Sequence, residues 1–521
     1  MSLNANIGLL SDPDKADRIF GITRGIEKEG LRIDPTGHLS ISEHPKCLGS
    51  ALTHPNITTD FSEALLEFIT EPSSSISDVM AQLSEIHQIA YQHLDQELLW
   101  ASSMPCQLGE EESIPIGQYG SSNIGMMKTI YRRGLGHRYG RHMQTIAGIH
   151  YNFSVPDSLW EDLKKAAKNT QSLKDFKSEG YFGLIRNFRR YSWLLLYLLG
   201  AAPAVCRSFV RNQNHSLVPV GEDTHSLYQP YATSLRMGDL GYQSDAQSSL
   251  EVSYNELSEY TQTLHKALST NYPSYCDIGL KNKNGEYQQL NTNLLQIENE
   301  FYSAIRPKRT SASGETPIHA LQERGVEYIE VRCVDVNPLL PCGIDEETIC
   351  FLDTFLLFCL LKDSPKTDST ESACISTNIS RTVYSGRDPE LTLLQNGKEV
   401  LLREWGSSLI DQMAPVAQLL DSANQTDDYS NALAKMSARI KDAKNTPAAL
   451  MLGEMEENQE TFFAMAMRKT TEHKSHFMTQ KLSSSTKHKY EIMAELSIKK
   501  QRDIEVGDTM SFDDFLADYY R

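Results

Sequence analysis

The feature that most constrains the fold is a nine-residue stretch, 147–155, in which apolar and polar side chains alternate without a break. Its sequence is Ala-Gly-Ile-His-Tyr-Asn-Phe-Ser-Val, so the apolar side chains share one face of a strand while His150 and Asn152 share the other. Antiparallel sheets with one buried face produce this alternation. The sequence therefore predicts an antiparallel sheet that is buried on one face and carries polar, site-forming side chains on the other.

A second predicted strand, 21–33, carries two carboxylates on one face. Glu27 and Glu29 are two residues apart, so they point the same way. Two neighbouring carboxylates repel each other and are costly to bury unless positive charge neutralises them. We therefore interpret this pair as a site for divalent cations.

A third predicted strand, 326–333, places Glu330 beside Arg332 on one face. Two interpretations are open for this pair. It is either an ordinary surface ion pair, which would contribute little to stability, or a metal ligand beside a phosphate-binding arginine.

Residues 60–70 add further acids but are ambiguous in secondary structure. As a strand they place Glu63 and Glu67 on one face, and as a helix they place the same two residues one turn apart. Pro72 disfavours a helical conformation in the residue before it, which favours the strand. Carboxylates on separate predicted strands, together with His150, suit Mg²⁺, or Mn²⁺, which accepts a nitrogen ligand.

Basic residues are concentrated in the segment 128–142, which contains no acid and holds Lys128, Arg132, Arg133, Arg138 and Arg141. In a chain of formal net charge −18, this local excess favours an anionic ligand such as a nucleotide or a carboxylate. A solvated basic face is the alternative. A second basic stretch, 306–309, precedes a loop and suits phosphate.

Several divalent cations together with arginines are typical of phosphoryl transfer. The sequence contains neither a Walker A motif nor a kinase glycine-rich loop, so a nucleotide site must belong to another fold.

Composition excludes several classes of protein. The net charge of −18 argues against non-specific binding to nucleic acid or to an anionic membrane. The longest apolar runs, 193–205 and 355–361, are shorter than the roughly 20 residues that span a bilayer. Nine scattered cysteines without CxxC spacing predict reduced thiols and a cytoplasmic protein.

Strand-like patterns end near residue 340, and helical patterns follow. We therefore expect one catalytic domain over residues 1–521. Within it, a sheet-rich core at about 15–340 would carry the site, and helices at about 344–521 would cover that core.

Five motifs, in order along essentially the whole chain, together resemble the proteobacterial type of glutamate–cysteine ligase. They are Gly25-Ile-Glu-Lys-Glu-Gly-Leu-Arg32, Thr59-Asp-Phe-Ser-Glu-Ala-Leu-Leu-Glu67, Gly148-Ile-His-Tyr-Asn-Phe-Ser154, Ser234-Leu-Arg-Met-Gly-Asp-Leu-Gly-Tyr242 and Tyr328-Ile-Glu-Val-Arg332.

The resemblance implies an α+β fold of the glutamine synthetase type, in which a curved antiparallel sheet, wrapped by helices, holds the active site on its concave face. It also implies a reaction. The γ-carboxyl of L-glutamate is joined to the amine of L-cysteine through a γ-glutamyl phosphate, and ATP is cleaved to ADP and phosphate. This is the first step of glutathione biosynthesis.

The resemblance also implies roles for individual residues. Two catalytic arginines are implied: Arg332, which would face the transferring phosphoryl group, and Arg236, which with Arg132 would bind substrate carboxylate or phosphate. The cysteine pocket would consist of Tyr131, Tyr242 and Tyr302, which without the resemblance are ordinary packing residues. The Mg²⁺ ligands would be Glu27, Glu29, Asp60, Glu67, His150 and Glu330.

The resemblance further implies inhibition by glutathione, which would occupy the glutamate and cysteine pockets together. We expect a monomer, although the sequence itself does not give the oligomeric state. Two other classes stay open from the sequence. One is a related ATP-dependent ligase that uses another acid or amine, and the other is a non-catalytic protein that binds divalent cations. Phosphate release that depends on both glutamate and cysteine would distinguish them.

Overall fold

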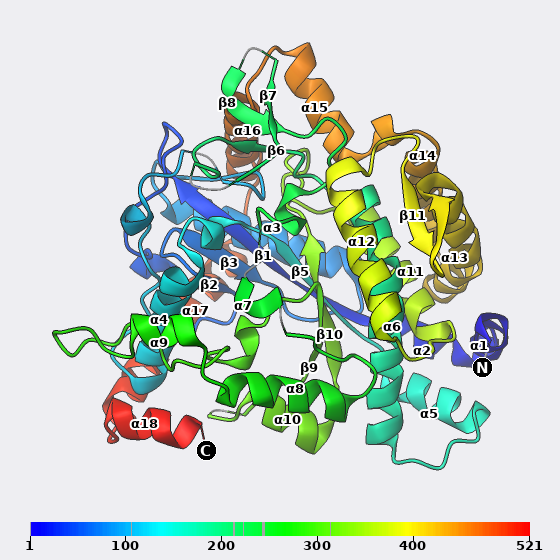
Figure 1. Cartoon of the computed structure of the whole chain (residues 1–521), viewed down its shortest axis with the longest axis horizontal. Coiled ribbons are helices and arrows are strands. Elements are labelled where there is room, and N and C mark those ends of the chain that lie inside the picture. Colours follow the sequence, from blue (N-terminus) through cyan, green and yellow to red (C-terminus); the bar gives the residue numbers. More distant parts are fainter. Residues whose placement is uncertain are drawn as a thin grey trace.

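A seven-stranded antiparallel sheet forms the centre of the molecule (Figure 1). The computed structural model describes residues 2–105, 107–211, 214–221, 223–241, 245–248, 250–312 and 314–520. Six strands lie side by side in the order β2 (Ile57–Thr59), β3 (Leu65–Ile69), β1 (Thr23–Ile33), β5 (Ile149–Ser154), β10 (Tyr328–Val334) and β9 (Ile305–Lys308), and β4 (Leu98–Leu99) pairs with the end of β1.

This arrangement confirms the prediction of an α+β fold built on an antiparallel sheet. The strands expected within 21–33, 147–155 and 326–333 are all present, and 65–69 is a strand rather than a helix.

One face of the sheet is apolar and is covered by helices. Ile26, Tyr151 and Val331 lie next to one another across β1, β5 and β10, and each is almost fully buried. The strands contact α3 (Ile76–His93) and α6 (Leu173–Leu199), and α11 (Glu346–Leu361) reaches β1 and β5 through its Asp353 side chain. Burial on nearly all sides explains why α11 is mostly apolar between Ile349 and Leu361, with Asp353 and Thr354 as the buried exceptions.

The remaining elements surround this core. Before β10 the chain also forms α1 (Leu3–Leu10), α2 (Ala16–Phe20), α4 (Asn123–Tyr139), α5 (Asp157–Ala166), α7 (Asp245–Ser248), α8 (Leu257–Ser269), α9 (Pro273–Ile278) and α10 (Pro317–Arg324). The C-terminal helices are α12 (Ser369–Ser385), α13 (Leu402–Asn424), α14 (Asp428–Lys441), α15 (Pro447–Glu457), α16 (Phe462–Thr479), α17 (Ser484–Gly507) and α18 (Phe512–Tyr519). Two small sheets consist of β6 (Ala204–Cys206), β8 (Asp223–Tyr228) and β7 (Val218–Val220), and of β11 (Thr392–Gln395) and β12 (Lys398–Leu401).

The structure bears on two predictions made from composition, one about membrane-spanning helices and one about the cysteines. Within the described ranges, none of the helices is long and apolar enough to cross a bilayer. The expectation of reduced thiols throughout is wrong at Cys206, which is disulfide-bonded. Cysteine spacing could not reveal this bond, because pairing depends on proximity in the folded chain and not on a local motif. The free cysteines among the described residues are Cys47, Cys276, Cys333, Cys342, Cys350, Cys359 and Cys374.

A buried ion pair joins the sheet to the helix layer. Arg24 of β1 lies 2.8 Å from Asp353 of α11 (Nη2 to Oδ2), and both side chains are almost fully buried. The Tyr151 hydroxyl donates a hydrogen bond to the other carboxylate oxygen at 2.6 Å. Arg24 also donates to the Ser74 carbonyl. The carboxylate therefore has a partner on each of two strands.

We expect Asp353→Leu to lower the free energy of unfolding by about 3–5 kcal/mol, because the Arg24 charge stays buried without its partner. Tyr151→Phe is the matched control. It removes one hydrogen bond to the same carboxylate and should cost about 1–2 kcal/mol. Chemical denaturation followed by circular dichroism measures both variants, and equal losses would contradict a dominant role for the ion pair.

Acid should destabilise the fold through buried neutral histidines. Nδ1 of His54 accepts hydrogen bonds from the amides of Asn56 and Ile57 at 3.1 and 3.0 Å, just before β2. Burial lowers the pKa of His54 to about 4, against roughly 6.5 in an unfolded chain. The folded state thus resists protonation, and stability is lost as the pH falls through 6.5 towards 4.

Between pH 7 and pH 5 this one group should cost about 2 kcal/mol of unfolding free energy. His54→Asn keeps an acceptor oxygen that does not titrate, so its stability should vary less over the same range. Urea unfolding at each pH tests this, and an identical pH dependence in the two proteins would show that His54 is not involved.

Candidate functional site

The face of the sheet opposite α3, α6 and α11 opens into a pocket of about 380 Å³. Strands β1, β3, β5, β9 and β10 supply its floor. Its walls come from α4, segment 297–302, the start of α10, and α18. Ten of the residues singled out from the sequence line it: Glu27, Glu29, Asp60, Glu67, Tyr131, Arg132, His150, Tyr302, Glu330 and Arg332.

Strand register brings the acidic residues together. Glu29 pairs directly with Glu67 across β1 and β3, and Glu27 pairs directly with His150 across β1 and β5. On β10, Glu330 lies opposite Asn152 of β5. Directly paired residues share a face of the sheet, so these side chains converge although Glu27 and Glu330 are about 300 residues apart in sequence.

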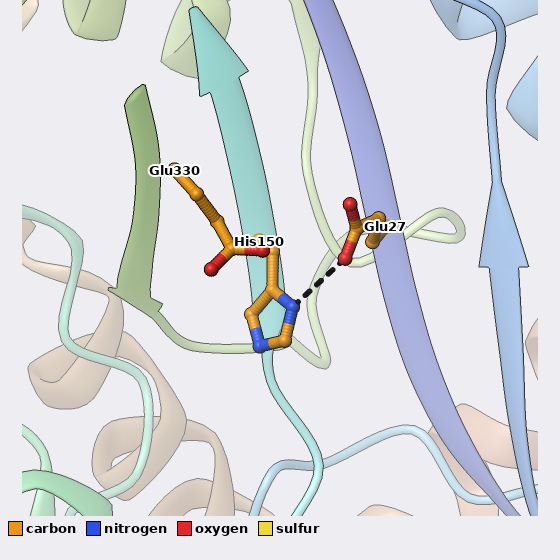
Figure 2. A group of neighbouring side chains, drawn as sticks. All are labelled: Glu27, His150 and Glu330. Atoms are coloured by element: carbon orange, nitrogen blue, oxygen red, sulfur yellow. Dashed lines mark hydrogen bonds and ion pairs between the residues drawn. The ribbon is translucent and has the colours of Figure 1, made fainter. Parts of the chain in front are cut away.

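Glu27, His150 and Glu330 form a group that suits a metal ion (Figure 2). One ligand atom from each lies within 4.8 Å of the others. His150 Nδ1 lies 3.1 Å from Glu27 Oε2, and His150 Nε2 lies 3.5 Å from Glu29 Oε1. Carboxylate oxygens with a single imidazole nitrogen are a donor set for Mg²⁺ or Mn²⁺, so the residues fit the metal that the sequence implies.

Repulsion among the carboxylates is visible in the acidity of Glu67 and Glu29. Burial, followed by the negative charges of Glu27, Asp60 and Glu29, holds the pKa of Glu67 well above its usual value. Burial also raises the pKa of Glu29. The site therefore carries more negative charge than its own residues stabilise, and a bound cation would relieve this imbalance.

Glu330 has the opposite environment. Burial alone would raise its pKa, but the positive charges of Lys308 and Arg332 outweigh that effect and hold the pKa well below its usual value. Lys308 Nζ lies 3.2 Å from Glu330 Oε1, and Arg332 Nη1 lies 3.2 Å from Oε2. Because Glu330 is 1% exposed, this is not the surface ion pair that the sequence left open.

The basic segment 128–142 forms most of α4. Some of its cationic side chains line the pocket, and others contact other parts of the protein. Lys128 and Arg132 line the pocket. Arg138 instead forms a fully buried pair with Glu300, 3.0 Å apart, and Arg141 donates to the Ile114 carbonyl. The segment is therefore neither a solvated face nor wholly a ligand site.

One predicted residue does not line the pocket. Arg236 is not among the residues that line the pocket, and its Nε lies 2.8 Å from Asp335 Oδ1. Its Nη2 donates to the carbonyls of Val334 and Arg332 at 2.9 and 3.1 Å, so it contacts the end of β10. Tyr242 lies outside the described residues. Tyr302 does line the pocket, with its hydroxyl 3.2 Å from Met237 Sδ.

The structure adds to what the sequence indicated about the pocket. Lys308 on β9 belongs to the basic stretch 306–309 that the sequence assigns to phosphate, and it pairs with Glu330. Tyr519 on α18 also lines the pocket. No sequence pattern marks Tyr519, which lies almost 190 residues beyond Arg332.

Comparison with known proteins gives a consistent result. The family model described as glutamate–cysteine ligase matches residues 7–382. Glutamate–cysteine ligase of Saccharophagus degradans is 50% identical over 98% of this chain and 97% of its own, and that of Alcanivorax borkumensis is 48% identical over 99% of both chains.

Solved structures agree. The crystal structure of glutamate–cysteine ligase from Francisella tularensis in complex with AMP has a TM-score of 0.90 at 35% identity, covering 96% of this chain and 97% of that one. A bifunctional glutathione synthetase from Pasteurella multocida shares the fold, with a TM-score of 0.70 at 22% identity over 94% of this chain and 57% of that one. The sequence resemblance is therefore confirmed, and the chain belongs to the glutamate–cysteine ligase family.

Proposed function

We propose that this chain catalyses the ATP-dependent ligation of the L-glutamate γ-carboxyl to the L-cysteine amine in the cytoplasm, as the first step of glutathione biosynthesis. The observation that carries the proposal is the pocket itself. In a member of this family, carboxylates, His150 and Arg332 from four separate strands converge on one cavity beside Tyr131 and Tyr302.

The chemistry explains why such a site needs both signs of charge. A carboxylate is a poor electrophile, so the γ-carboxylate oxygen first attacks the γ-phosphorus of ATP, and ADP leaves. The cysteine amine then attacks the acyl carbon, loses a proton, and phosphate leaves. The first step brings two anions together, which is favourable only where fixed positive charge compensates them.

Mg²⁺, or Mn²⁺, would supply most of that charge and would be held by Glu27, Glu29, Asp60, Glu67, His150 and Glu330. Arg332 would stabilise the transferring phosphoryl group, because its guanidinium lines the pocket and is fixed by Glu330 at 3.2 Å. Lys308, on the other side of Glu330, would add a second positive charge.

The amino-acid substrates would be bound by the remaining predicted residues. Arg132 lines the pocket and would bind a substrate carboxylate, and the cysteine pocket would consist of Tyr131, Tyr302 and Tyr242. Arg236 would act through its neighbours. Its ion pair with Asp335 and its hydrogen bond to the Arg332 carbonyl support the strand end that presents Arg332.

We propose that residues 1–521 form a single catalytic domain, since residues from Glu27 to Tyr519 line one pocket. The sheet would have the curvature of glutamine synthetase, with its concave face towards the pocket. The protein would act as a monomer, and glutathione would inhibit it by occupying the glutamate and cysteine positions together.

The direct test is phosphate release from ATP, with the product identified by mass spectrometry. Release should require Mg²⁺, L-glutamate and L-cysteine together, and γ-glutamylcysteine should accumulate with it. Equal rates when cysteine is omitted or replaced by other amines would contradict the substrate assignment, while the family assignment would stand.

We expect Glu29→Gln to lower kcat/KM by at least about 100-fold at saturating Mg²⁺, because the variant removes one charge from the cation site. Glu63→Gln is the matched control, since Glu63 is also buried on the acidic stretch before β3 but does not line the pocket. Titration with Mn²⁺, followed by electron paramagnetic resonance, measures metal binding separately. Full activity in Glu29→Gln would argue against the cation site.

We expect Arg332→Lys to lower kcat by about 100-fold with a smaller change in the KM for ATP, because lysine keeps the charge but loses the planar fork that two oxygens can share. Arg309→Lys is the control. Arg309 pairs with Glu327 at 3.6 Å and does not line the pocket. Steady-state kinetics distinguish the two variants, and a similar kcat for both would exclude phosphoryl stabilisation by Arg332.

A further inference from the structure

The C-terminal helix α18 forms part of the pocket wall, well beyond the residues that match the family model. It contacts α4, and Figure 1 shows it in red at the C-terminal end of the chain. Its Leu516 belongs to a small apolar cluster with Met127 and Ile130 of α4. Tyr131, Ile297 and Tyr519 pack against this cluster and also line the pocket.

Polar contacts hold this end of the chain in place. The Asn123 amide, at the start of α4, donates a hydrogen bond to Asp508, and Asn123 Nδ2 donates to the Met510 carbonyl at 3.0 Å. The Tyr520 hydroxyl donates to the Gln296 carbonyl at 2.8 Å. Tyr519 is therefore held between two ordered segments of the pocket wall.

The pocket differs in chemistry between its floor and this wall. Charged side chains cover the sheet, whereas the wall beside α18 is mainly apolar and consists of Ile124, Met127, Tyr131, Ile297 and Tyr519. The wall adjoins cations of the floor, because Arg306 of β9 donates to the Asn299 carbonyl at 2.9 Å. An aromatic surface next to phosphate-binding cations is the arrangement that a nucleotide requires, with its base on the apolar side.

A second apolar group in the pocket, around Phe61 and Leu135, is less suited to a base beside phosphates. Phe61 directly follows Asp60, so this group adjoins the carboxylate end of the site. Glu298 favours the wall at α18, because it also lines the pocket near Tyr519. Its Oε1 accepts a hydrogen bond from the Ile318 amide at 3.4 Å, and its other oxygen could accept one from the exocyclic amino group of adenine.

We propose that Tyr519 contacts the substrate and that its ring packs against the adenine base of ATP, with Ile124, Met127 and Ile297 completing the apolar surface. The inference rests on the proposed function only in taking ATP as the nucleotide. Burial and the nearby Glu298 carboxylate raise the pKa of Tyr519, so the phenol is neutral at physiological pH and offers an uncharged face.

The test measures binding of AMP and of inorganic tripolyphosphate to the full-length protein by isothermal titration calorimetry. Removing an aromatic ring from a stacked base weakens binding substantially, so Tyr519→Ala should weaken AMP binding about tenfold. Binding of tripolyphosphate, which has no base, should stay unchanged. In steady-state kinetics the KM for ATP should rise by a similar factor, while kcat and the KM values for glutamate and cysteine change less than twofold.

Three further variants sharpen the test. Tyr519→Phe keeps the ring and should bind AMP like the unmodified protein. Tyr520→Phe removes the hydrogen bond to Gln296 next to it and should not change AMP affinity. If Tyr519→Ala does not fold, Tyr519→Leu keeps the apolar packing and removes only the aromatic face, and the same loss of AMP affinity is expected.

Three results would overturn the proposal: unchanged AMP affinity in the folded Tyr519 variants, equal loss of AMP and tripolyphosphate affinity, or a raised KM for an amino acid instead of ATP. AMP binding does not depend on ligation. A protein that bound AMP through Tyr519 but made no γ-glutamylcysteine would disprove the proposed function and leave this inference standing.

Discussion

The register of β1 is the constraint on which the rest of the structure depends. Its alternating residues divide between two environments. Glu27 and Glu29 face the pocket, whereas Ile26 and Lys28 face the helices. A slip of one residue would exchange the two sets and bury both carboxylates under α3. The helix side opposes such a slip, because Arg24 is paired with Asp353 and Lys28 Nζ lies 2.7 Å from His87 Nε2. Burial lowers the pKa of Lys28 to about 8.

Charge on the pocket side is balanced unevenly along the sheet. Towards β9, Glu330 is buried with Lys308 and Arg332 and keeps its negative charge readily. Towards β3, Glu67 is half-buried beside other carboxylates, and partial burial together with these negative charges raises its pKa. One end of the floor therefore stabilises its own charge, and an added cation would stabilise the other end. Such an arrangement favours ligands that bring metal and phosphate together, since each completes the electrostatics of the other.

Sequence patterns predicted well on which face of the sheet each site residue lies. They predicted less well which of these residues contact one another. Alternation around His150 and Glu27 assigns each side chain to a face, because a strand has a period of two. It does not determine which strands are neighbours, so the direct pairing of Glu29 with Glu67 emerges only from the folded sheet. Composition also failed to distinguish Arg132, which lines the pocket, from Arg138, which is buried against Glu300. Both lie on one helix, and only the tertiary surroundings separate their roles.

Sequence patterns also did not predict the contacts of the C-terminal segment, which lies much further along the chain. These contacts involve the start of α4. The first amides of a helix lack partners within it, and carboxylates near that end are favourable. Glu505 accepts a hydrogen bond from the Ser121 amide at 2.9 Å, and Asp508 accepts one from Asn123. These contacts fix the start of the helix that presents Arg132 to the pocket. Residues after 500 therefore shape a site whose charged groups all precede residue 340, by holding the wall opposite the sheet.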